Sequence, residues 1–523
     1  MWFFGKKKNV DSDEGKIQYK VTPFMNLSDD EIAECSELFG NNYGVYNNLA
    51  KKPGKQIQMS VNLYKKYYYE PHYYIATARY DDKLIGQAIY YRNQIKGIWD
   101  EEKNNSEKKI MSWVVQLVVS KEFRQRGIAS TLLRSIWGFS NDYAWGLATS
   151  NPCTVKTLES ATFRQCKPKV ILKHMPEIRA LIQEIPFVNG EDIKVSNSSS
   201  QVDSKFFVQN TEYKDEDIIK RLGELRDGHE WLAFVFQSQD INHANYEKHF
   251  DEMVKFSEMK LRDAYTRMDM KSHGWAKNTG AEVDYIIKYG EGNKILDLGC
   301  GQGRHSLELA SIGFNVKGID FSEQHIENAK CENAKCGINN CEFECADIRF
   351  YNDKTEYDRV LCLYDVVGSF PEKKDNQKII MTAYNHLKVN GYLILSVMNM
   401  ELTSSLVSIE HKVNLKKNPR ALAELKPSNT MQRTGDIFNP ELLLIDTATS
   451  LVYRKEQFID DSKLPAEYVI RDKRYTKDEI CALIEECGFV IEQAQYVSAG
   501  HFETSLDATD IHAKEILIVA KKL

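Results

Sequence analysis

The stretch ILDLGCGQGRHSLELA, residues 295–310, decides the fold of the second half of the chain. An apolar run that predicts a strand is followed directly by a pattern that predicts a helix. Between them lie Asp297, Gly299, Gly301 and Gly303. A nicotinamide-binding turn needs the spacing Gly-x-Gly-x-x-Gly, and here the last of those positions is Arg304. The spacing therefore argues against a nicotinamide site.

Strand and helix patterns alternate around this turn. After a helix over 244–268, they predict strands in 294–299, 315–320, 341–347, 358–365 and 391–398, and helices over 303–312, 323–335 and 376–387. Such alternation indicates a parallel sheet with crossover connections. An antiparallel pair, 489–499 and 513–522, is expected to finish that sheet. Residues 401–475 form an insertion with hairpin-like strands in 442–458.

With these motifs, residues 241–523 resemble the class I S-adenosylmethionine (SAM) methyltransferases, which have a Rossmann-like seven-stranded fold. Asp320 ends the second strand and would accept hydrogen bonds from the ribose hydroxyls of SAM. Asp347 ends the third strand and would bind the adenine amino group, with Ile348 beside the ring. The SAM site implied by the resemblance comprises Asp297, Gly299, Gly301, Gly303, Asp320, Asp347, Ile348 and Leu363.

The fourth strand, YDRVLCLYDVVGSF (357–370), narrows the acceptor. It has neither the Asn/Asp-Pro-Pro-Tyr/Phe signature of methyltransferases acting on base amino groups nor the Pro-Cys nucleophile used on cytosine carbon. What remains resembles enzymes that methylate nitrogen or oxygen of small metabolites, where alignment matters more than a dedicated base. Tyr364, Asp365 and Asn399 follow strand ends; each could contact substrate or be a cap or loop polar group. The insertion would form a lid or acceptor wall.

In the first half, FRQRGIAS (123–130) follows the apolar run WVVQLVV. Arg124, Gly127 and Ala129 make an Arg-x-x-Gly-x-Ala pattern between a strand and a helix. Free backbone amides and the helix dipole favour a pyrophosphate there, and Arg124 and Arg126 can add charge at the rim. Taken alone, the stretch fits an ordinary charged turn equally well.

The surrounding elements give this turn a context. The sequence predicts a hairpin of 73–80 and 83–92, strands in 112–119, 144–150, 167–172 and 230–236, helices over 128–138, 152–162 and 175–185, and a Ser-rich loop at 195–204. With ATSNPCTVKTLESATFR (148–164), residues 15–175 resemble the GNAT family of N-acetyltransferases, and 176–240 form an extension. The resemblance implies a mixed α/β fold and an acetyl-CoA site made of Leu117, Val119, Arg124, Gln125, Arg126, Gly127, Ile128, Ala129 and Asn151.

The sequence departs from the GNAT pattern at a position that many members use for catalysis. Many GNAT members carry a tyrosine after that asparagine as general acid, and the matching position is Leu158. Either another group or water protonates the thiolate, or the domain binds coenzyme without catalysing. Gln116 lies where relatives sometimes place a polar positioning group, but it cannot be a base near neutral pH, and a polar strand residue explains it better. Tyr73 and Tyr74 could be acids or core aromatics.

Composition bounds the remaining possibilities. The 523 residues carry a net charge of −6, 42% hydrophobic and 28% charged residues, which suits a soluble protein of several domains. Neither half is strongly basic, which argues against a bulk nucleic-acid partner. No apolar run is long enough to span a membrane. The eleven cysteines predict a reducing, cytoplasmic setting, and the cluster Cys331, Cys336, Cys341 and Cys345 lacks CxxC spacing, so buried or neutral thiols are expected and no metal.

The leading interpretation is a bifunctional transferase with acetyl-CoA and SAM as cofactors and a small-molecule acceptor. Two alternatives stay open: a methyltransferase with a non-catalytic acetyl-CoA-binding module, and modification of a protein or RNA. The sequence identifies neither the acceptors nor the oligomeric state.

Overall fold

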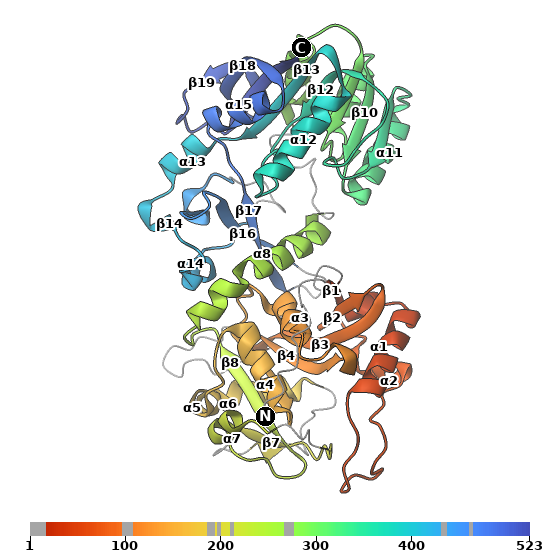
Figure 1. Cartoon of the computed structure of the whole chain (residues 1–523), viewed down its shortest axis with the longest axis vertical. Helices are drawn as coiled ribbons and strands as arrows, with labels where there is room; N and C mark the ends of the chain where they lie inside the picture. The colour runs from red at the N-terminus through yellow and green to blue at the C-terminus, as the bar shows by residue number, and fades with distance from the viewer. Residues whose placement is uncertain are drawn as a thin grey trace, which may run out of the picture. The chain divides into compact units, whose positions relative to one another are not determined.

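The computed structural model describes residues 17–96, 108–185, 194–195, 200–209, 214–265, 277–429, 437–459 and 464–523 (Figure 1). The chain divides into two compact units. Unit 1 comprises Met1–Ser257 with Ile459–Glu467, and unit 2 comprises Glu258–Phe458 with Tyr468–Leu523. The boundary falls within helix α8 (His243–Tyr265). Unit 1 thus extends past residue 240 and takes in a short segment of the insertion.

Unit 1 is built on an eight-stranded sheet. Its order is β1 (Ile17–Pro23), β2 (Tyr73–Tyr80), β3 (Lys83–Lys96), β4 (Lys108–Val119), β5 (Ala144–Thr149), β8 (His229–Phe236), β7 (Gln201–Asp203), β6 (Lys194–Val195). The expected hairpin is confirmed by the antiparallel pairing of β2 with β3. Among the described strands of this sheet, β4 and β5 alone pair in parallel, and their register ends at Val114 opposite Leu147. The last residues of β4, 115–119, therefore separate from β5 while staying paired with β3.

The helices of unit 1 are α1 (Asp29–Asn42), α2 (Val61–Tyr68), α3 (Ile128–Trp137), α4 (Pro152–Thr162), α5 (Pro168–Lys173), α6 (Met175–Gln183) and α7 (Glu216–Leu222). The strand predicted in 167–172 is wrong, because this segment is helix α5. Pro168 takes the first helical position, where its missing N–H costs no hydrogen bond. Ile171 is the buried residue of this short helix, and Val170 and Leu172 are partly buried against the same core.

Unit 2 contains a second eight-stranded sheet. Its order is β11 (Cys341–Cys345), β10 (Asn315–Asp320), β9 (Lys294–Leu298), β12 (Tyr357–Cys362), β13 (Leu387–Met398), β20 (Glu515–Lys522), β18 (Phe489–Ser498), β19 (His501–Leu506). The first five strands run parallel, and β20 pairs antiparallel with β13 and β18, as expected. Strand β19 is an eighth strand beyond the seven expected.

Helices α9 (Thr279–Ile286), α10 (Arg304–Ser311), α11 (Glu323–Cys336), α12 (Lys373–His386) and α15 (Lys477–Glu486) accompany this sheet. The insertion adds helices α13 (Met400–Leu406) and α14 (Pro419–Glu424) and a separate sheet, ordered β14 (Lys412–Val413), β15 (Leu444–Asp446), β16 (Val452–Ile459), β17 (Pro465–Asp472). The antiparallel pairing of β15 with β16 confirms the hairpin-like strands expected there.

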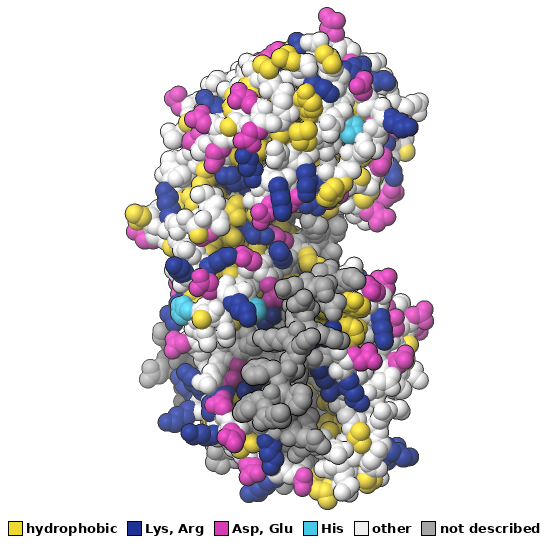
Figure 2. Space-filling view, in the orientation of Figure 1, with side chains coloured by type: hydrophobic (Ala, Val, Ile, Leu, Met, Phe, Trp, Pro, Cys, Tyr) yellow, Lys and Arg dark blue, Asp and Glu magenta, His cyan; other side chains and the backbone are white. Residues whose placement is uncertain are grey.

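Surface charge, helix hydrophobicity and cysteine exposure are relevant to nucleic-acid, membrane and metal binding. Lysine, arginine and acidic side chains are interspersed on the face shown in Figure 2. In the parts of the chain that the structure describes, no helix combines the length and apolar character needed to cross a membrane. Cys331, Cys336 and Cys345 are exposed and Cys341 is buried, so most thiols of this cluster are not in the core. The described residues contain no group of three or more His, Cys, Asp or Glu that could hold a metal ion.

Candidate functional site

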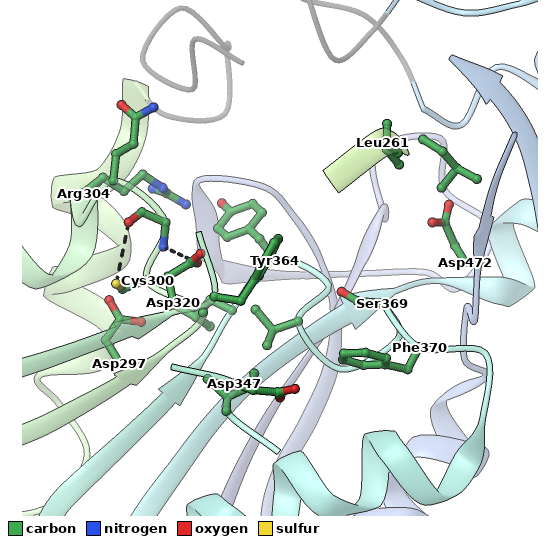
Figure 3. Close-up of a pocket in the computed structure, with 18 of the residues that line it drawn as sticks. Leu261, Asp297, Cys300, Arg304, Asp320, Asp347, Tyr364, Ser369, Phe370 and Asp472 are labelled. Atoms are coloured by element: carbon green, nitrogen blue, oxygen red, sulfur yellow. Dashed lines mark hydrogen bonds between the residues drawn. The ribbon is translucent and has the colours of Figure 1, made fainter. Parts of the chain in front are cut away.

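A cavity of about 450 Å³ opens where the parallel strands of unit 2 end (Figure 3). Ligands collect at this edge of such sheets because loops and helix N-termini converge there. Seven of the eight residues expected to bind SAM line it: Asp297, Gly299, Gly301, Asp320, Asp347, Ile348 and Leu363.

Two positions of the turn require glycine, because their backbone is left-handed and neighbouring side chains leave no room for a Cβ. Gly299 and Gly303 have φ of +78° and +79°, in the left-handed region. A Cβ at Gly299 would lie 2.4 Å from the Val366 side chain, and one at Gly303 would lie 2.6 Å from the Phe343 ring. Any other residue would be both strained and in collision. Gly303 does not line the cavity, so it keeps the turn close to the sheet rather than facing a ligand.

Two carboxylates anchor the turn. Asp320 accepts a hydrogen bond from the backbone N–H of Gly301 at 2.9 Å through Oδ2, and one from Ser322 N–H at 2.9 Å through Oδ1. Asp297 is 3% exposed and accepts a hydrogen bond from the Ser306 hydroxyl at 2.6 Å. Burial raises the pKa of both carboxyl groups.

At the next strand end, Asp347 forms a bidentate pair with Arg349. The Nε–Oδ1 distance is 3.0 Å and the Nη2–Oδ2 distance is 2.6 Å. The guanidinium of Arg349 also lies over the ring of Phe370, 4.3 Å from its centroid. Phe370 lines the cavity together with Ile348, so an aromatic and an aliphatic side chain flank this carboxylate.

Sequence reasoning missed Glu282, which organises one side of the site. Glu282 is on α9, is fully buried, and accepts hydrogen bonds from Arg304 Nη1 at 2.6 Å and Gly500 N–H at 2.9 Å. Its carboxylate also lies 2.7 Å from His305 Nε2 and accepts a hydrogen bond from the Tyr364 hydroxyl. Burial raises its pKa, but the bond to His305 and the charge of Arg304 outweigh burial and hold it below its usual range.

Tyr364, Asp365 and Asn399, which the sequence analysis considered for substrate contact, differ in position. Tyr364 lines the cavity, and its ring lies 4.5 Å from the guanidinium of Arg304. Asp365 follows it and does not line the cavity; its Oδ1 is buried without a hydrogen-bond partner among the described residues. Burial and the neighbouring Asp472 raise the pKa of Asp365 to about 7.

Asn399 is fully buried and acts as a cap. Its amide donates to the carbonyls of Ala508 and Ala513 at 2.8 and 2.7 Å, and its Oδ1 accepts from Leu402 N–H at 3.1 Å. These bonds use the donors of the amide, so the structure supports the cap interpretation and not substrate contact.

The opposite wall comes from the insertion and from α8. It consists of Arg454, Ile470, Arg471 and Asp472 from β16 and β17, with Glu258 and Leu261 from α8. Val366, Ser369, Phe370 and Pro371 complete it from the loop after β12. The sequence located this wall only as an insertion and identified none of its side chains, because no local pattern shows which face of a short strand meets a distant loop.

In unit 1, the FRQRGIAS turn leads into α3. Gly127 has φ +81° and an added Cβ would meet nothing within 4 Å. The N-cap residue of α3 is Gly127, which has no side chain to cap the first amides, so they can donate to an anion. The two arginines are engaged with the protein: Arg124 Nε donates to the Val119 carbonyl at 3.1 Å, and Arg126 lies over the Phe123 ring. In this arrangement the arginines brace the turn, and the backbone supplies its donors.

Leu117 and Val119 lie in the segment of β4 that has separated from β5. Asn151 caps α4, because its Oδ1 accepts from Cys153 N–H at 2.9 Å. Gln116 is 4% exposed, and its Oε1 accepts from the Tyr64 hydroxyl at 2.7 Å. Leu158 is fully buried. Tyr73 and Tyr74 are buried in the hydrophobic core.

Comparison with known proteins agrees with both halves. The GNAT acetyltransferase family model matches residues 43–142, and a methyltransferase domain model matches residues 290–461. The chain joins a GNAT-family domain to a methyltransferase-family domain. The cavity with the glycine turn therefore lies in the methyltransferase domain, and the FRQRGIAS turn lies in the GNAT domain.

The methyltransferase domain is similar to curated proteins. A ubiquinone biosynthesis O-methyltransferase of Rickettsia prowazekii is 32% identical over 145 residues, which cover 24% of this chain and 56% of that protein. A protein of the same name from Idiomarina loihiensis is 29% identical over 167 residues, covering 28% of this chain and 67% of its own length. The chain spans a little over half the length of the first of these relatives. Among solved structures, a SAM-dependent methyltransferase of Clostridium acetobutylicum is 16% identical with a TM-score of 0.35, covering 51% of this chain and 98% of that one.

Proposed function

We propose that the protein is a bifunctional transferase, with acetyl-CoA bound in residues 15–240 and SAM bound in residues 241–523. One observation carries the methyltransferase part: the glycine turn and three carboxylates, each at or next to the carboxyl end of one of three neighbouring strands, line one cavity. The methyl group goes to a nitrogen or oxygen of a small metabolite. The eleven free cysteines suit a cytoplasmic protein.

The cavity offers a partner for each part of SAM. Asp320 accepts hydrogen bonds from the backbone amides of Gly301, Ser322 and Phe321, and the lone-pair capacity left on its carboxylate would serve the ribose hydroxyls. Asp347 and Ile348 suit the adenine amino group and ring. Arg304, fixed by Glu282, offers a cation for the carboxylate of the methionine part.

The chain's main contribution to the transfer is geometry. SAM supplies a sulfonium-bound methyl group that is already a good electrophile. The apolar residues Leu261, Val366, Phe370 and Ile470 line the cavity and limit water near it. Holding an acceptor atom in line with the methyl carbon is then sufficient for reaction without a dedicated base.

In the GNAT domain, the separated end of β4 and the uncapped start of α3 support coenzyme binding. Extended pantetheine can pair with the edge of 115–119 that has separated from β5, where the Val119 carbonyl already accepts from Arg124, and the pyrophosphate can lie against the amides after Gly127. Arg124 and Arg126 keep the turn in shape. The acetyl group would pass to an amine of a small molecule.

In a second candidate function, the protein catalyses only methyl transfer and the GNAT domain is not catalytic. Leu158 is fully buried and cannot act as an acid, and Gln116 is bonded to Tyr64 and Gln87 inside the core. These observations favour a GNAT domain that binds acetyl-CoA without transferring the acetyl group.

The two candidates are separated by supplying labelled donors to a lysate with the purified full chain. Label from SAM is expected in small molecules. Label in protein or RNA would show that the methyl acceptor is a macromolecule. Label from acetyl-CoA in an amine supports bifunctionality. Binding of acetyl-CoA without any transfer supports the second candidate, and no binding at all ends the bifunctional proposal.

A further inference from the structure

At the adenine end of the proposed SAM site, the side chain of Arg349 joins three elements of unit 2. Its guanidinium forms the bidentate pair with Asp347, which follows β11, and lies over the ring of Phe370 in the loop between β12 and α12. Its Nη1 also lies 3.6 Å from Oδ2 of Asp375, in the first turn of α12. Asp347 and Phe370 line the cavity and lie close together in Figure 3, whereas Arg349 does not line it. Arg349 would therefore affect a ligand through these two neighbours.

The turn after β11 fixes Asp347 from the backbone as well. Oδ1 of Asp347 accepts a hydrogen bond from the backbone N–H of Arg349 at 3.0 Å, and its carbonyl accepts one from Phe350 N–H at 3.0 Å. With the guanidinium added, both oxygens of the carboxylate are held in a charge-assisted pair. The side chain of Asp347 is still 39% exposed, so a ligand in the cavity can reach it.

The other contacts of Arg349 fix the position of this carboxylate relative to the ring of Phe370. A guanidinium is planar, so one group can present a fork to a carboxylate and a flat face to an aromatic ring. Here the guanidinium carbon lies 4.3 Å from the ring centroid of Phe370. Asp375 is itself paired with Lys378, at 2.8 Å between Oδ1 and Nζ, and its contact with Arg349 ties the guanidinium to α12. An ammonium group is a point charge and could not present the fork and the flat face at once.

We propose, on the basis of the proposed SAM site, that Arg349 is a positioning residue that makes this site selective for adenine. By holding the Asp347 carboxylate at a fixed distance from the Phe370 ring, it aligns an acceptor with the 6-amino group of a base that packs against this wall. An ionised carboxylate only accepts hydrogen bonds, so it suits the amino group of adenine and opposes the 6-oxygen of hypoxanthine. Hydrogen bonds weaken steeply when they are out of line, so the selectivity depends on the alignment that Arg349 maintains.

The test compares two ligands that differ at one position of the base. S-adenosylhomocysteine carries the 6-amino group, and S-inosylhomocysteine carries an oxygen there, with the same ribose and the same homocysteine. Calorimetric titration of the full chain with each ligand gives the ratio of their affinities. The unmodified protein is expected to bind S-adenosylhomocysteine more tightly than S-inosylhomocysteine, by about tenfold or more.

In R349M this ratio of affinities is expected to fall about fivefold or more, because the carboxylate and the ring lose the group that aligns them. R349K keeps a positive charge without the fork and the flat face, so it should lose a similar share of the ratio. K378M is the matched control and should leave the ratio unchanged. Lys378 is also a cation, pairs with the same Asp375 and lies 5.1 Å from the centroid of an aromatic ring, but it does not line the cavity.

A ratio near one in the unmodified protein would overturn the proposal. So would a ratio that R349M or R349K leaves unchanged, even if both ligands bind more weakly, because Arg349 would then support the fold without selecting the base. A fall in K378M as large as that in R349M would overturn it as well. If R349M does not fold, R349K decides by the same measurement. Failure of the unmodified protein to bind either ligand would instead overturn the proposed SAM site.

Discussion

At the scale of single residues, Gly127 and Gly54 form a matched pair. Their φ values are +81° and +74°, and an added Cβ at either position meets nothing within 4 Å. An alanine therefore carries the same backbone cost at both positions, about 1–2 kcal/mol. Only Gly127 begins the helix that follows the FRQRGIAS turn. Comparing alanine substitutions at the two positions therefore separates the loss of stability caused by backbone strain from the loss of affinity caused by blocking a ligand.

Gly127→Ala is expected to lower the affinity for acetyl-CoA by about tenfold or more, because the methyl group occupies space that the pyrophosphate needs. Gly54→Ala should leave that affinity unchanged while losing similar stability. Calorimetric titration with acetyl-CoA and thermal unfolding of both variants provide the measurements. Equal affinities in the two variants would mean that the turn does not hold the coenzyme.

Some residues of the candidate site could be identified from the sequence and others could not. Asp297, Asp320 and Asp347 were identifiable because each lies at or next to the end of a strand, at the spacing of a known motif. Glu282 was not, since its partners include Arg304, Tyr364 and Gly500, which are distant in the chain and follow no fixed spacing. Asp472 was missed for the same reason. For Asn399 the sequence left substrate contact and a cap open, and the structure shows the cap.

At the scale of elements, Glu282 connects α9 to the start of α10, to the loop after β12 and to the β18–β19 turn. Its pKa lies below its usual range, so the ionised carboxylate stabilises the folded state at neutral pH. That contribution is lost as the pH falls through the pKa of the folded state.

Glu282→Gln is therefore expected to lower the unfolding free energy at pH 7, and its difference from the unmodified protein should shrink below about pH 4. Urea unfolding at both pH values measures this. Glu308→Gln, which removes an exposed carboxylate of α10, is the control and should change little at either pH. A Glu282→Gln deficit that is the same at pH 4 and pH 7 would contradict the stabilising role of the ionised form.

Asp365, in the loop between β12 and α12, is expected to change the stability with pH in the direction opposite to Glu282. Its pKa is raised to about 7 by burial and by Asp472, so the folded state keeps a proton that the unfolded chain has released. Its contribution to stability falls as the pH rises towards 7. Asp365→Asn is expected to raise the thermal midpoint, and to do so more at pH 8 than at pH 5. A larger gain at pH 5 would show that the carboxyl is not destabilised by ionisation.

Elements were easier to predict than side-chain contacts. The strand–helix alternation of the methyltransferase domain and the β2–β3 hairpin follow from apolar periodicity. Helix α5 was predicted as a strand because its run KPKVIL has a strand-like composition and too few residues to show helical spacing. The short strand β19 has no continuous apolar pattern, since only Phe502 is buried in it.

At the scale of the whole molecule, the chain passes between its units inside α8 and again in the insertion. The first part of α8 belongs to the core of unit 1, where Phe250, Met253 and Val254 are almost fully buried. Arg134 on α3 is 4% exposed and pairs with Glu252 at 2.7 Å. No sequence signal marks this boundary, because the helical pattern runs through it without a break.

A fragment ending at residue 240 is therefore expected to be less stable than one ending at residue 257. The shorter fragment exposes the surface that Phe250 and Met253 cover and leaves Arg134 without Glu252. Thermal unfolding of the two fragments compares them directly. Equal midpoints would show that the GNAT domain does not depend on α8.

Calorimetric titration of the full chain with SAM shows whether the cavity of the methyltransferase domain holds SAM through Asp320. One site per chain is expected, with binding reduced about a hundredfold or more in Asp320→Asn, which keeps the size of the side chain but removes its charge. Acetyl-CoA binding should be the same in both proteins. No SAM binding to the unmodified chain would show that the cavity does not hold SAM, and undiminished binding to Asp320→Asn would show that Asp320 does not hold it.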